Sequence, residues 1–200
     1  MLSFAFNELK AHKVLGMCHC ENKKSASIME KAGMSKQDVF REEYLCGGVK
    51  MLEVEFATMS DFLSLMELVR LVSWNFPGLE TEENILDYER TLHKNINRQS
   101  AICAKENSKV VGILLFSTKH NVLSCMAVHP GYRRRSIARQ MISMMFTKLD
   151  ITKDITVTTF REYDERGIAP RELYKKLGFL EGELIKEFDY PLQKLILHAK

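Results

Sequence analysis

Hydrophobic residues recur with two different periods along the chain from Met51 onward. Residues 52–56 alternate between apolar and polar, which is typical of a half-buried β-strand. Apolar residues then follow at helical spacing: Phe62, Leu65, Met66, Val69 and Val72. Ser60 stands where an N-cap belongs, with Asp61 in the first turn, so a helix is expected to begin there. A weaker helical pattern covers residues 82–96.

Three strand-like runs follow at residues 101–104, 110–116 and 122–128, separated by two short polar segments. Short polar segments of this kind join antiparallel neighbours, so we expect two hairpins. After Pro130 the helical period returns in Ile137, Met141, Met144, Met145 and Leu149. The methionines fit a core better than a ligand set, because a thioether side chain is a flexible apolar filler.

The last part of the chain repeats strand and helix. Residues 155–160 predict a strand, and a charged loop leads from it to a helix over residues 170–176, which Gly178 is placed to end. Two further strands are expected at residues 179–188 and 193–198. The order of these elements predicts an α/β domain of layered type with a mixed sheet.

Composition excludes several classes of protein. The chain has 200 residues, of which 46% are hydrophobic and 28% charged, so a disordered or fibrous chain is excluded. At roughly 150 residues per domain, the length predicts one domain with a remainder. The formal net charge of +3 is too small to indicate a nucleic-acid-binding protein.

The cysteines, at positions 18, 20, 46, 103 and 125, show no Cys-x-x-Cys spacing and fit a reducing, cytoplasmic compartment. The Cys18-His19-Cys20 triplet lacks a second cluster, so we expect no metal site. Early charges interrupt what would be the apolar core of a signal peptide. No run approaches the ~20 apolar residues of a membrane span, so we expect a soluble protein with no membrane partner.

The segment from His129 to Ala138 (HPGYRRRSIA) lies between a predicted strand and a predicted helix. The start of a helix presents unpaired backbone amides at the positive end of the helix dipole, which favours an anion. Small residues at 136 and 138 let a ligand approach the backbone, and the arginines add charge at the flank. A solvated basic turn, or a nucleic-acid contact through the arginines, are the alternative interpretations.

The same segment resembles the acyl-CoA pyrophosphate loop of the GNAT superfamily of N-acyltransferases. The family pattern Q/R-x-x-G-x-G/A is matched by Arg133, Ser136 and Ala138, with serine in place of the first glycine. A second family element, LYxKxGF, is matched by the run Leu173-Tyr174-Lys175-Lys176-Leu177-Gly178-Phe179. Residues 51–200 therefore resemble a complete GNAT acetyltransferase domain.

The resemblance implies a mostly antiparallel mixed sheet flanked by helices, with a V-shaped opening between the fourth and fifth strands, residues 122–128 and 155–160. It also implies acetyl-CoA as the cofactor, with its pantetheine arm along the fourth strand and its pyrophosphate at the loop. The cofactor-binding residues expected on this basis are Met126, Ala127, Val128, Arg133, Arg134, Arg135, Ser136, Ile137 and Ala138.

The resemblance further implies direct attack of a primary amine on the thioester in a ternary complex. Tyr174 matches the family tyrosine assigned as the acid, and a phenol with a pKa of ~10 is of the right order to meet a thiolate of ~8.5. Packing of Tyr174 against the sheet is the alternative. Glu162 is the nearest candidate for the base, followed by Asp164, and a bound water is equally consistent with the sequence. Glu162 could also be a solvated loop charge or a contact for the substrate ammonium.

The first fifty residues contain a partial internal repeat. Residues 22–34 align without gaps on residues 167–179, with Met29 opposite Tyr174, and they contain no pyrophosphate loop. Residues 1–50 therefore resemble the C-terminal fragment of a second GNAT domain, with strands expected at residues 13–20 and 37–45 and a helix between them at residues 25–32. A fragment of this size can hardly bury a sufficient core alone, so we expect it to dock on residues 51–200 or on a second chain as a homodimer. A functionally idle relic is the alternative.

The sequence thus predicts an acetyl-CoA-dependent N-acetyltransferase with a small-molecule or peptide amine as acceptor. The alternative, from a different class, is a non-catalytic acyl-CoA-binding or regulatory module. A nucleic-acid partner is not expected. Four acidic residues around the second helix could attract a cationic amine or simply form a solvated face: Glu80, Glu82, Glu83 and Asp87.

Overall fold

The computed structural model describes residues 23–34 and 52–199. The chain divides into two compact units, Met1–Lys50 and Met51–Lys200. In the first unit the described segment forms helix α2 (Lys23–Lys31) at the place where a helix is expected. The other elements expected there lie outside the described residues, so the assignment of this unit as a partial GNAT domain stays a prediction.

The aligned ends of the internal repeat share one local structure. After α2, Gly33 has a φ of 82°, and the amide that follows it donates to the Met29 carbonyl over 3.0 Å. At the end of helix α6 (Ile168–Lys176), Gly178 has a φ of 93°, and the next amide donates to the Tyr174 carbonyl over 3.0 Å. Glycine suits both positions because it adopts the left-handed conformation without a Cβ clash.

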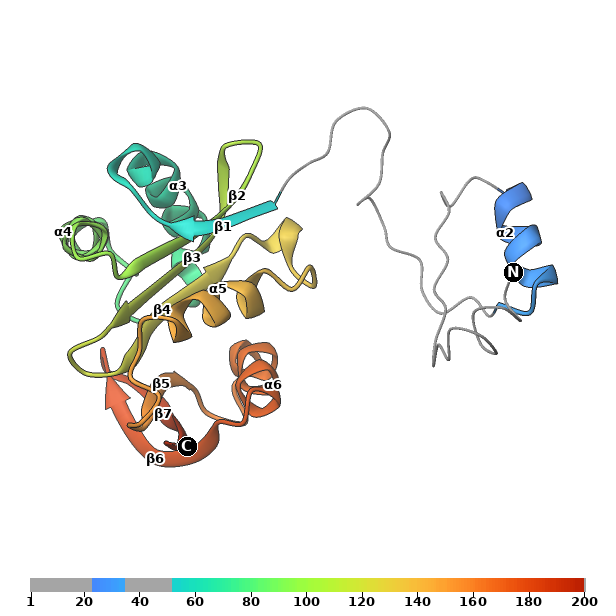
Figure 1. Ribbon diagram of the computed structural model, residues 1–200. Coiled ribbons are helices and arrows are strands. Elements are labelled where there is room, and N and C mark those ends of the chain that lie inside the picture. Colours follow the sequence, from blue (N-terminus) through green and yellow to red (C-terminus); the bar gives the residue numbers. More distant parts are fainter. Residues whose placement is uncertain (1–22, 35–51, 200) are drawn as a thin grey trace. The chain divides into compact units, whose positions relative to one another are not determined.

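The second unit contains the elements that the periodicity predicts, in the predicted order (Figure 1). Its strands and remaining α-helices are β1 (Leu52–Phe56), α3 (Phe62–Val72), α4 (Glu82–Asn97), β2 (Ala101–Glu106), β3 (Lys109–Ser117), β4 (Val122–Val128), α5 (Ile137–Phe146), β5 (Ile155–Phe160), β6 (Leu180–Glu187) and β7 (Tyr190–Leu197). Short 3-10 turns link them: η1 (Met59–Asp61), η2 (Ser73–Asn75), η3 (Pro130–Tyr132) and η4 (Glu165–Gly167). Among the described residues, none of the helices is both long and apolar enough to cross a bilayer.

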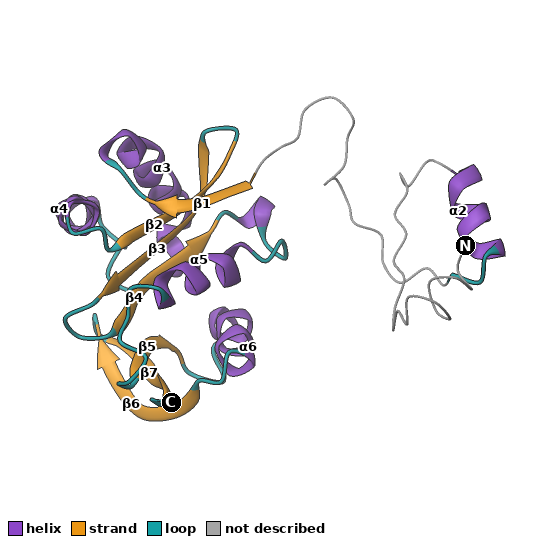
Figure 2. Ribbon diagram, viewed as in Figure 1, coloured by secondary structure: helices purple, strands orange, loops and turns teal. Residues whose placement is uncertain are grey.

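The strands form one seven-stranded sheet in the order β1-β2-β3-β4-β5-β7-β6, with helices on both faces (Figure 2). All neighbouring pairs are antiparallel except β4 and β5. That parallel pairing joins Val122 to Thr156 and Leu123 to Val157, and extends no further. The mixed, mostly antiparallel sheet and the splay between the fourth and fifth strands are therefore confirmed.

A β-bulge lies where the two strands separate. In the β3–β4 pair, Phe116 is opposite Leu123 and Leu115 is opposite Cys125, so Ser124 is an extra residue without a partner in β3. A bulge bends its strand and increases the local twist. The bend coincides with the end of the β4–β5 pairing, so β4 turns away from β5 at this point.

The sheet separates two hydrophobic cores. On one face, α5 and α6 pack on the sheet through residues such as Met141 and Tyr174, and on the other face α3 and α4 pack through residues such as Leu65 and Leu92. Met141 and Met145 are fully buried, which confirms them as core residues. Side chains of β4 alternate between the cores, as the pleat of a strand requires.

Three local expectations are wrong. Helix α6 begins at Ile168 rather than Pro170, because proline is tolerated within the first turn of a helix. Helix α5 ends at Phe146, and Leu149 reaches the core from the loop that follows. Strand β7 begins at Tyr190, earlier than expected, because a two-residue turn joins it directly to β6.

The start of α3 also differs from the expectation that Ser60 is the N-cap. Thr58 precedes the turn, and its amide donates to the Asp61 carboxylate over 2.8 Å. Asp61 is buried, and its carboxylate accepts a contact of 2.5 Å from the Lys105 ammonium, which also lies 2.5 Å from Glu55. Burial alone would raise the pKa of Asp61, but the hydrogen bonds from Lys105 and Thr58 outweigh it and lower that pKa.

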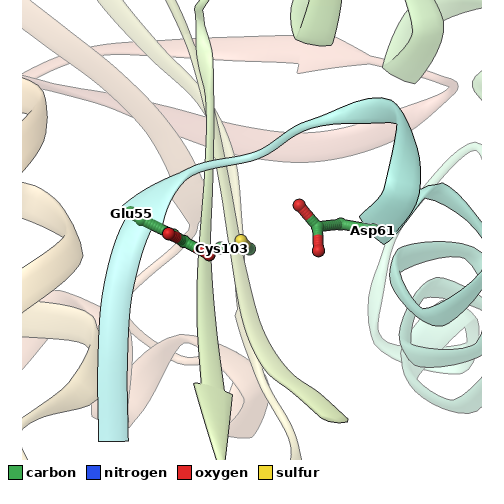
Figure 3. A group of neighbouring side chains, drawn as sticks. All are labelled: Glu55, Asp61 and Cys103. Carbon is green, nitrogen blue, oxygen red and sulfur yellow. The ribbon is translucent and has the colours of Figure 1, made fainter. Parts of the chain in front are cut away.

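Glu55, Asp61 and Cys103 bring ligand atoms within 4.8 Å of one another, an arrangement that resembles a metal site (Figure 3). The Lys105 ammonium bridges the two carboxylates and supplies the cation of this cluster. Burial, and then the nearby Asp61, raise the pKa of Cys103 to about 12, so its sulfur stays protonated at neutral pH. A protonated thiol is a poor metal ligand. The cluster is therefore an internal ion pair.

We expect Lys105→Met to lower the free energy of unfolding by about 3 kcal/mol, because it leaves the buried Asp61 carboxylate without its cation. Urea unfolding measures the change. The double variant Lys105→Met/Asp61→Asn should recover much of the loss, and failure to recover it would contradict the ion-pair explanation. Because the folded-state pKa of Asp61 is lowered, its contribution exists above the unfolded pKa of ~3.9 and disappears as pH falls through the folded value. The acid-induced loss of stability should therefore be smaller in Lys105→Met.

Candidate functional site

The opening between β4 and β5 is built by the end of their pairing. Beyond Leu123, the edge of β4 that faces β5 has no partner strand in the described part of the chain. Residues 124–128 therefore present unpaired backbone groups to the opening, and an extended ligand could join this edge as an added strand. Met126, Ala127 and Val128, which are expected to bind the cofactor, lie on this stretch and are half-buried.

Side chains near the opening belong to different faces of the sheet. Cys125 faces the core under α3 and α4, where the hydroxyl of Tyr88 on α4 donates to its sulfur over 3.4 Å. Tyr174 on α6 belongs to the core on the opposite face. Burial, and then the charge that a Cys125 thiolate would carry, raise the pKa of Tyr174.

Tyr174 is buried, with 4% of its surface exposed, and it packs against Phe179 at 5.6 Å between ring centroids. Every fully buried polar side-chain atom among the described residues has a hydrogen-bond partner, and the Tyr174 hydroxyl makes no hydrogen bond. That hydroxyl oxygen therefore lies on the small part of the residue that solvent reaches. The raised pKa keeps the phenol protonated, so it serves as a hydrogen-bond donor.

The loop before α5 exposes a row of backbone amides. Arg134 and Ser136 have φ values of 66° and 60°, so this turn places two residues in the left-handed conformation. Within the described chain, the amides of residues 134–139 donate to no protein acceptor, and the first helical bond runs from Gln140 to the Ser136 carbonyl over 3.0 Å. Ser136 occupies the N-cap position, although its side chain makes no capping hydrogen bond. Free amides at a helix N-terminus are suited to bind an anion.

Residues 97–181 match the model of the acetyltransferase (GNAT) domain. This part of the chain, less than half of its 200 residues, is therefore similar to a GNAT acetyltransferase domain. No curated protein sequence matches the chain. The fold is that of solved structures with low sequence identity, among them a GNAT-family acetyltransferase from Bacillus cereus ATCC 10987 (19% identity, TM-score 0.59), covering 75% of this chain and 99% of that one.

Two further structures share the fold. The PaiA N-acetyltransferase from Thermoplasma acidophilum, solved in complex with coenzyme A, is 17% identical, with a TM-score of 0.52, and 72% of this chain and 98% of that chain are covered. The ribosomal-protein-alanine N-acetyltransferase from Brucella melitensis is 17% identical, with a TM-score of 0.57, and 74% of this chain and 100% of that chain are covered.

The three arginines of the loop before α5, Arg133, Arg134 and Arg135, differ in their surroundings. Arg135 lies 3.2 Å from the buried carboxylate of Glu106, and its guanidinium lies over the Tyr132 ring at 5.4 Å. Its charge is thus largely neutralised within the protein. Arg133 and Arg134 are exposed. Arg135 therefore braces the loop against β2, and the charge available to a ligand comes from the other two arginines.

Helix α6, which carries Tyr174, is fixed by a buried arginine. Arg171 donates to the Phe160 carbonyl over 3.1 Å and to the Gln193 side chain over 2.8 Å, and pairs with Glu181 at 2.5 Å. Gly167 packs against β5 so closely that a Cβ there would lie 2.9 Å from that of Phe160. This contact explains why glycine, rather than a larger polar residue, occupies the position.

The acidic candidates after β5 differ in their surroundings. Glu162 is exposed in the turn directly after β5, and its assignment as base stays a prediction. Asp164 is bound by the Arg166 guanidinium and by the Tyr190 hydroxyl, which donates over 2.7 Å. Burial would raise the pKa of Asp164, but these hydrogen bonds lower it. The Arg166 guanidinium also lies over the Phe160 ring at 4.5 Å. Asp164 therefore belongs to a set of contacts with Arg166 and Tyr190 that fixes the loop after β5.

Sequence reasoning did not pair Tyr88 with Cys125. The helical pattern placed Tyr88 on an apolar stripe, and a lone cysteine in a strand indicates a small core residue. The two are 37 residues apart, and no local pattern pairs them. Burial raises the pKa of Cys125 to about 11, and the hydrogen bond from Tyr88 lowers it in part.

We expect Tyr88→Phe to raise the pKa of Cys125 further, because the thiolate loses its hydrogen-bond donor. Loss of one such bond of about 1.4 kcal/mol corresponds to about one pKa unit, so alkylation of Cys125 between pH 8 and 10 should slow about tenfold. Peptide mass spectrometry after maleimide treatment measures it site by site. Thr91→Val on the same helix is the control, and an unchanged rate in Tyr88→Phe would contradict the assignment.

Proposed function

We propose that residues 51–200 form an N-acetyltransferase that moves an acetyl group from acetyl-CoA to a primary amine by direct attack in a ternary complex. One observation carries the proposal: the unpaired edge of β4 runs from the end of its pairing with β5 to the free amides before α5. A thioester and an amine that reach this point from opposite faces would meet beside Tyr174.

The residues present fit an acyl-CoA ligand. The amides of residues 134–139 suit the pyrophosphate, with Arg133 and Arg134 as exposed charges, and residues 126–128 offer backbone groups to the amides of the pantetheine arm. Acetyl-CoA supplies the activated acyl group. The complexes that relatives form support the assignment, since the Thermoplasma acidophilum enzyme was solved with coenzyme A.

In this reaction the protein's side chains transfer protons to and from the reacting atoms. In the transfer, the amine nitrogen bonds to the acyl carbon, the carbon–sulfur bond breaks, the sulfur gains a proton and the nitrogen loses one. The Tyr174 hydroxyl gives its proton to the leaving sulfur, and its raised pKa keeps the phenol protonated until the carbon–sulfur bond breaks. Glu162, or a water, accepts the proton from the amine. Cys125 and Tyr88 line the face from which the amine approaches.

We expect Tyr174→Phe to lower kcat about 10²-fold, in the range of a lost general acid, while the Kd for coenzyme A changes less than twofold. Thiol release with a panel of amines and calorimetry with coenzyme A measure the two quantities. Cofactor binding without turnover in the wild-type protein would instead support the non-catalytic acyl-CoA-binding module. Loss of coenzyme A stabilisation in the wild type would reject both functions.

Ser136→Val should weaken coenzyme A binding about tenfold, because a β-branched residue is strained at a φ of 60° and distorts the row of amides. Ser136→Gly is the matched control and should keep the wild-type affinity, since glycine adopts this conformation freely. Calorimetric titration checks both variants. Equal affinities of Ser136→Val and Ser136→Gly would show that the amide row does not hold the ligand.

A further inference from the structure

The turn that leads into the loop before α5 is capped by a histidine. Turn η3 begins directly after His129, and the Gly131 amide donates to the Nδ1 atom of the His129 ring over 3.1 Å. The backbone of His129 accepts from the Tyr132 amide over 2.8 Å and donates to the Val111 carbonyl of β3 over 2.8 Å. A cap of this kind is normally the side-chain oxygen of Ser, Thr, Asp or Asn. A histidine cap differs from these, because a proton on Nδ1 removes the acceptor.

The hydrogen bond from Gly131 fixes the protonation state of the ring. A backbone amide can only donate, so Nδ1 of His129 carries a lone pair and the proton of the neutral ring is on Nε2. In an imidazolium both ring nitrogens carry protons, so an Nδ1–H group would point at the Gly131 amide and the cap would be lost. Histidine is the side chain that ordinarily changes its charge between about pH 5 and pH 8. The cap on η3 therefore requires the neutral ring.

The His129 ring also contacts the aromatic residue at the end of the turn. Its centroid lies 5.1 Å from that of Tyr132, with the two planes at 90°. Burial, and then a hydrogen bond to the Glu106 carboxylate of β2, raise the pKa of Tyr132. Glu106 also pairs with Arg135, whose guanidinium lies over the Tyr132 ring. The charged groups beside Tyr132 thus form a pair of opposite sign, and the contact of His129 with β3 is a backbone carbonyl. A proton on His129 therefore acts on the turn through the lost cap.

Turn η3 runs directly into the row of free amides. The Arg133 amide donates to the Pro130 carbonyl over 3.4 Å, and Arg134 and Ser136 then adopt the left-handed conformation. Residues other than glycine hold this conformation at a cost in free energy, and only where surrounding contacts enforce it. The cap at His129 is one of these contacts, because it fixes the turn from which the loop starts.

We propose that His129 is a positioning residue for coenzyme A: its neutral ring holds the turn that aligns the loop amides, and its protonation releases the turn and weakens binding. This inference rests on the proposed function, because it assigns the amides of residues 134–139 to the pyrophosphate. The affinity for coenzyme A should therefore fall as the pH falls and the neutral ring is lost. A positive charge on His129 would attract phosphates, but Arg133 and Arg134 already expose two such charges in the loop.

We expect the Kd for coenzyme A to rise about tenfold more in the wild-type protein than in His129→Asn when the pH is lowered from about 7.5 to about 5.5. The Oδ1 atom of asparagine is as many bonds from Cα as Nδ1 of histidine, so it can accept from the Gly131 amide and does not titrate. Calorimetric titration measures the Kd at each pH. The phosphates of coenzyme A titrate in the same way with every variant, so the difference between variants reports His129.

Two further variants complete the comparison. His120→Asn, in the exposed turn between β3 and β4, is the matched control and should keep the pH dependence of the wild-type protein. His129→Phe keeps an aromatic ring beside Tyr132 but has no acceptor, so it should bind about tenfold more weakly than His129→Asn at both pH values. An equal pH dependence in the wild-type protein and His129→Asn overturns the proposal. So does a wild-type affinity that rises at low pH relative to His129→Asn.

A second measurement requires neither coenzyme A nor turnover. Hydrogen–deuterium exchange of residues 129–140, corrected for the intrinsic pH dependence of amide exchange, should be about tenfold faster at the lower pH in the wild-type protein and unchanged in His129→Asn. Such a difference in a protein that binds no coenzyme A would refute the proposed function and keep the dependence of the turn on His129. Equal exchange in the two proteins would overturn the positioning role even if the protein is an active acetyltransferase.

Discussion

The parallel pairing of β4 with β5 stops after two residue pairs, and the rest of the site depends on that stop. If the parallel pairing continued, β5 would bind the backbone amides and carbonyls along this edge of β4. The sheet would then separate the two cores along the whole strand. The extra residue Ser124 bends β4 at this point, so its edge stays open and side chains from both faces come together.

Charged side chains hold the opening in shape. Arg171 ties α6 to the end of β5, Arg166 and Asp164 clamp the loop after β5, and Arg135 braces the loop before α5 against Glu106. Each of these groups is at least partly buried and is paired within the protein. A buried ion pair contributes more to a defined geometry than to stability, since desolvation opposes the Coulombic attraction. These ion pairs therefore keep the elements around the opening in fixed positions, which a site that aligns two reactants requires.

The order of helices and strands was predictable from local patterns. In a helix or a strand, the residues that face the core recur with a fixed period, and this period is visible in the sequence. The loop before α5 and the end of α6 were also predictable, since both depend on short-range backbone requirements. The long-range contact of Tyr88 with Cys125 was not predictable, because it depends on how α4 packs on the sheet. The pairing of Arg135 with Glu106 was not predicted either, because Glu106 lies on another strand, and the assignment of Arg135 to the cofactor stays a prediction.

The cluster of Lys105 with Glu55, Asp61 and Cys103 needs no ion from solution. Two carboxylates and a thiol are gathered as they would be around a metal ion, yet the cation is covalently part of the chain. Folding therefore places one such cation in every protein molecule. Neither a chelator nor a shortage of metal ions can remove it. Shortening that single side chain would leave two acidic groups around an empty space, a starting point from which a divalent-ion site could evolve.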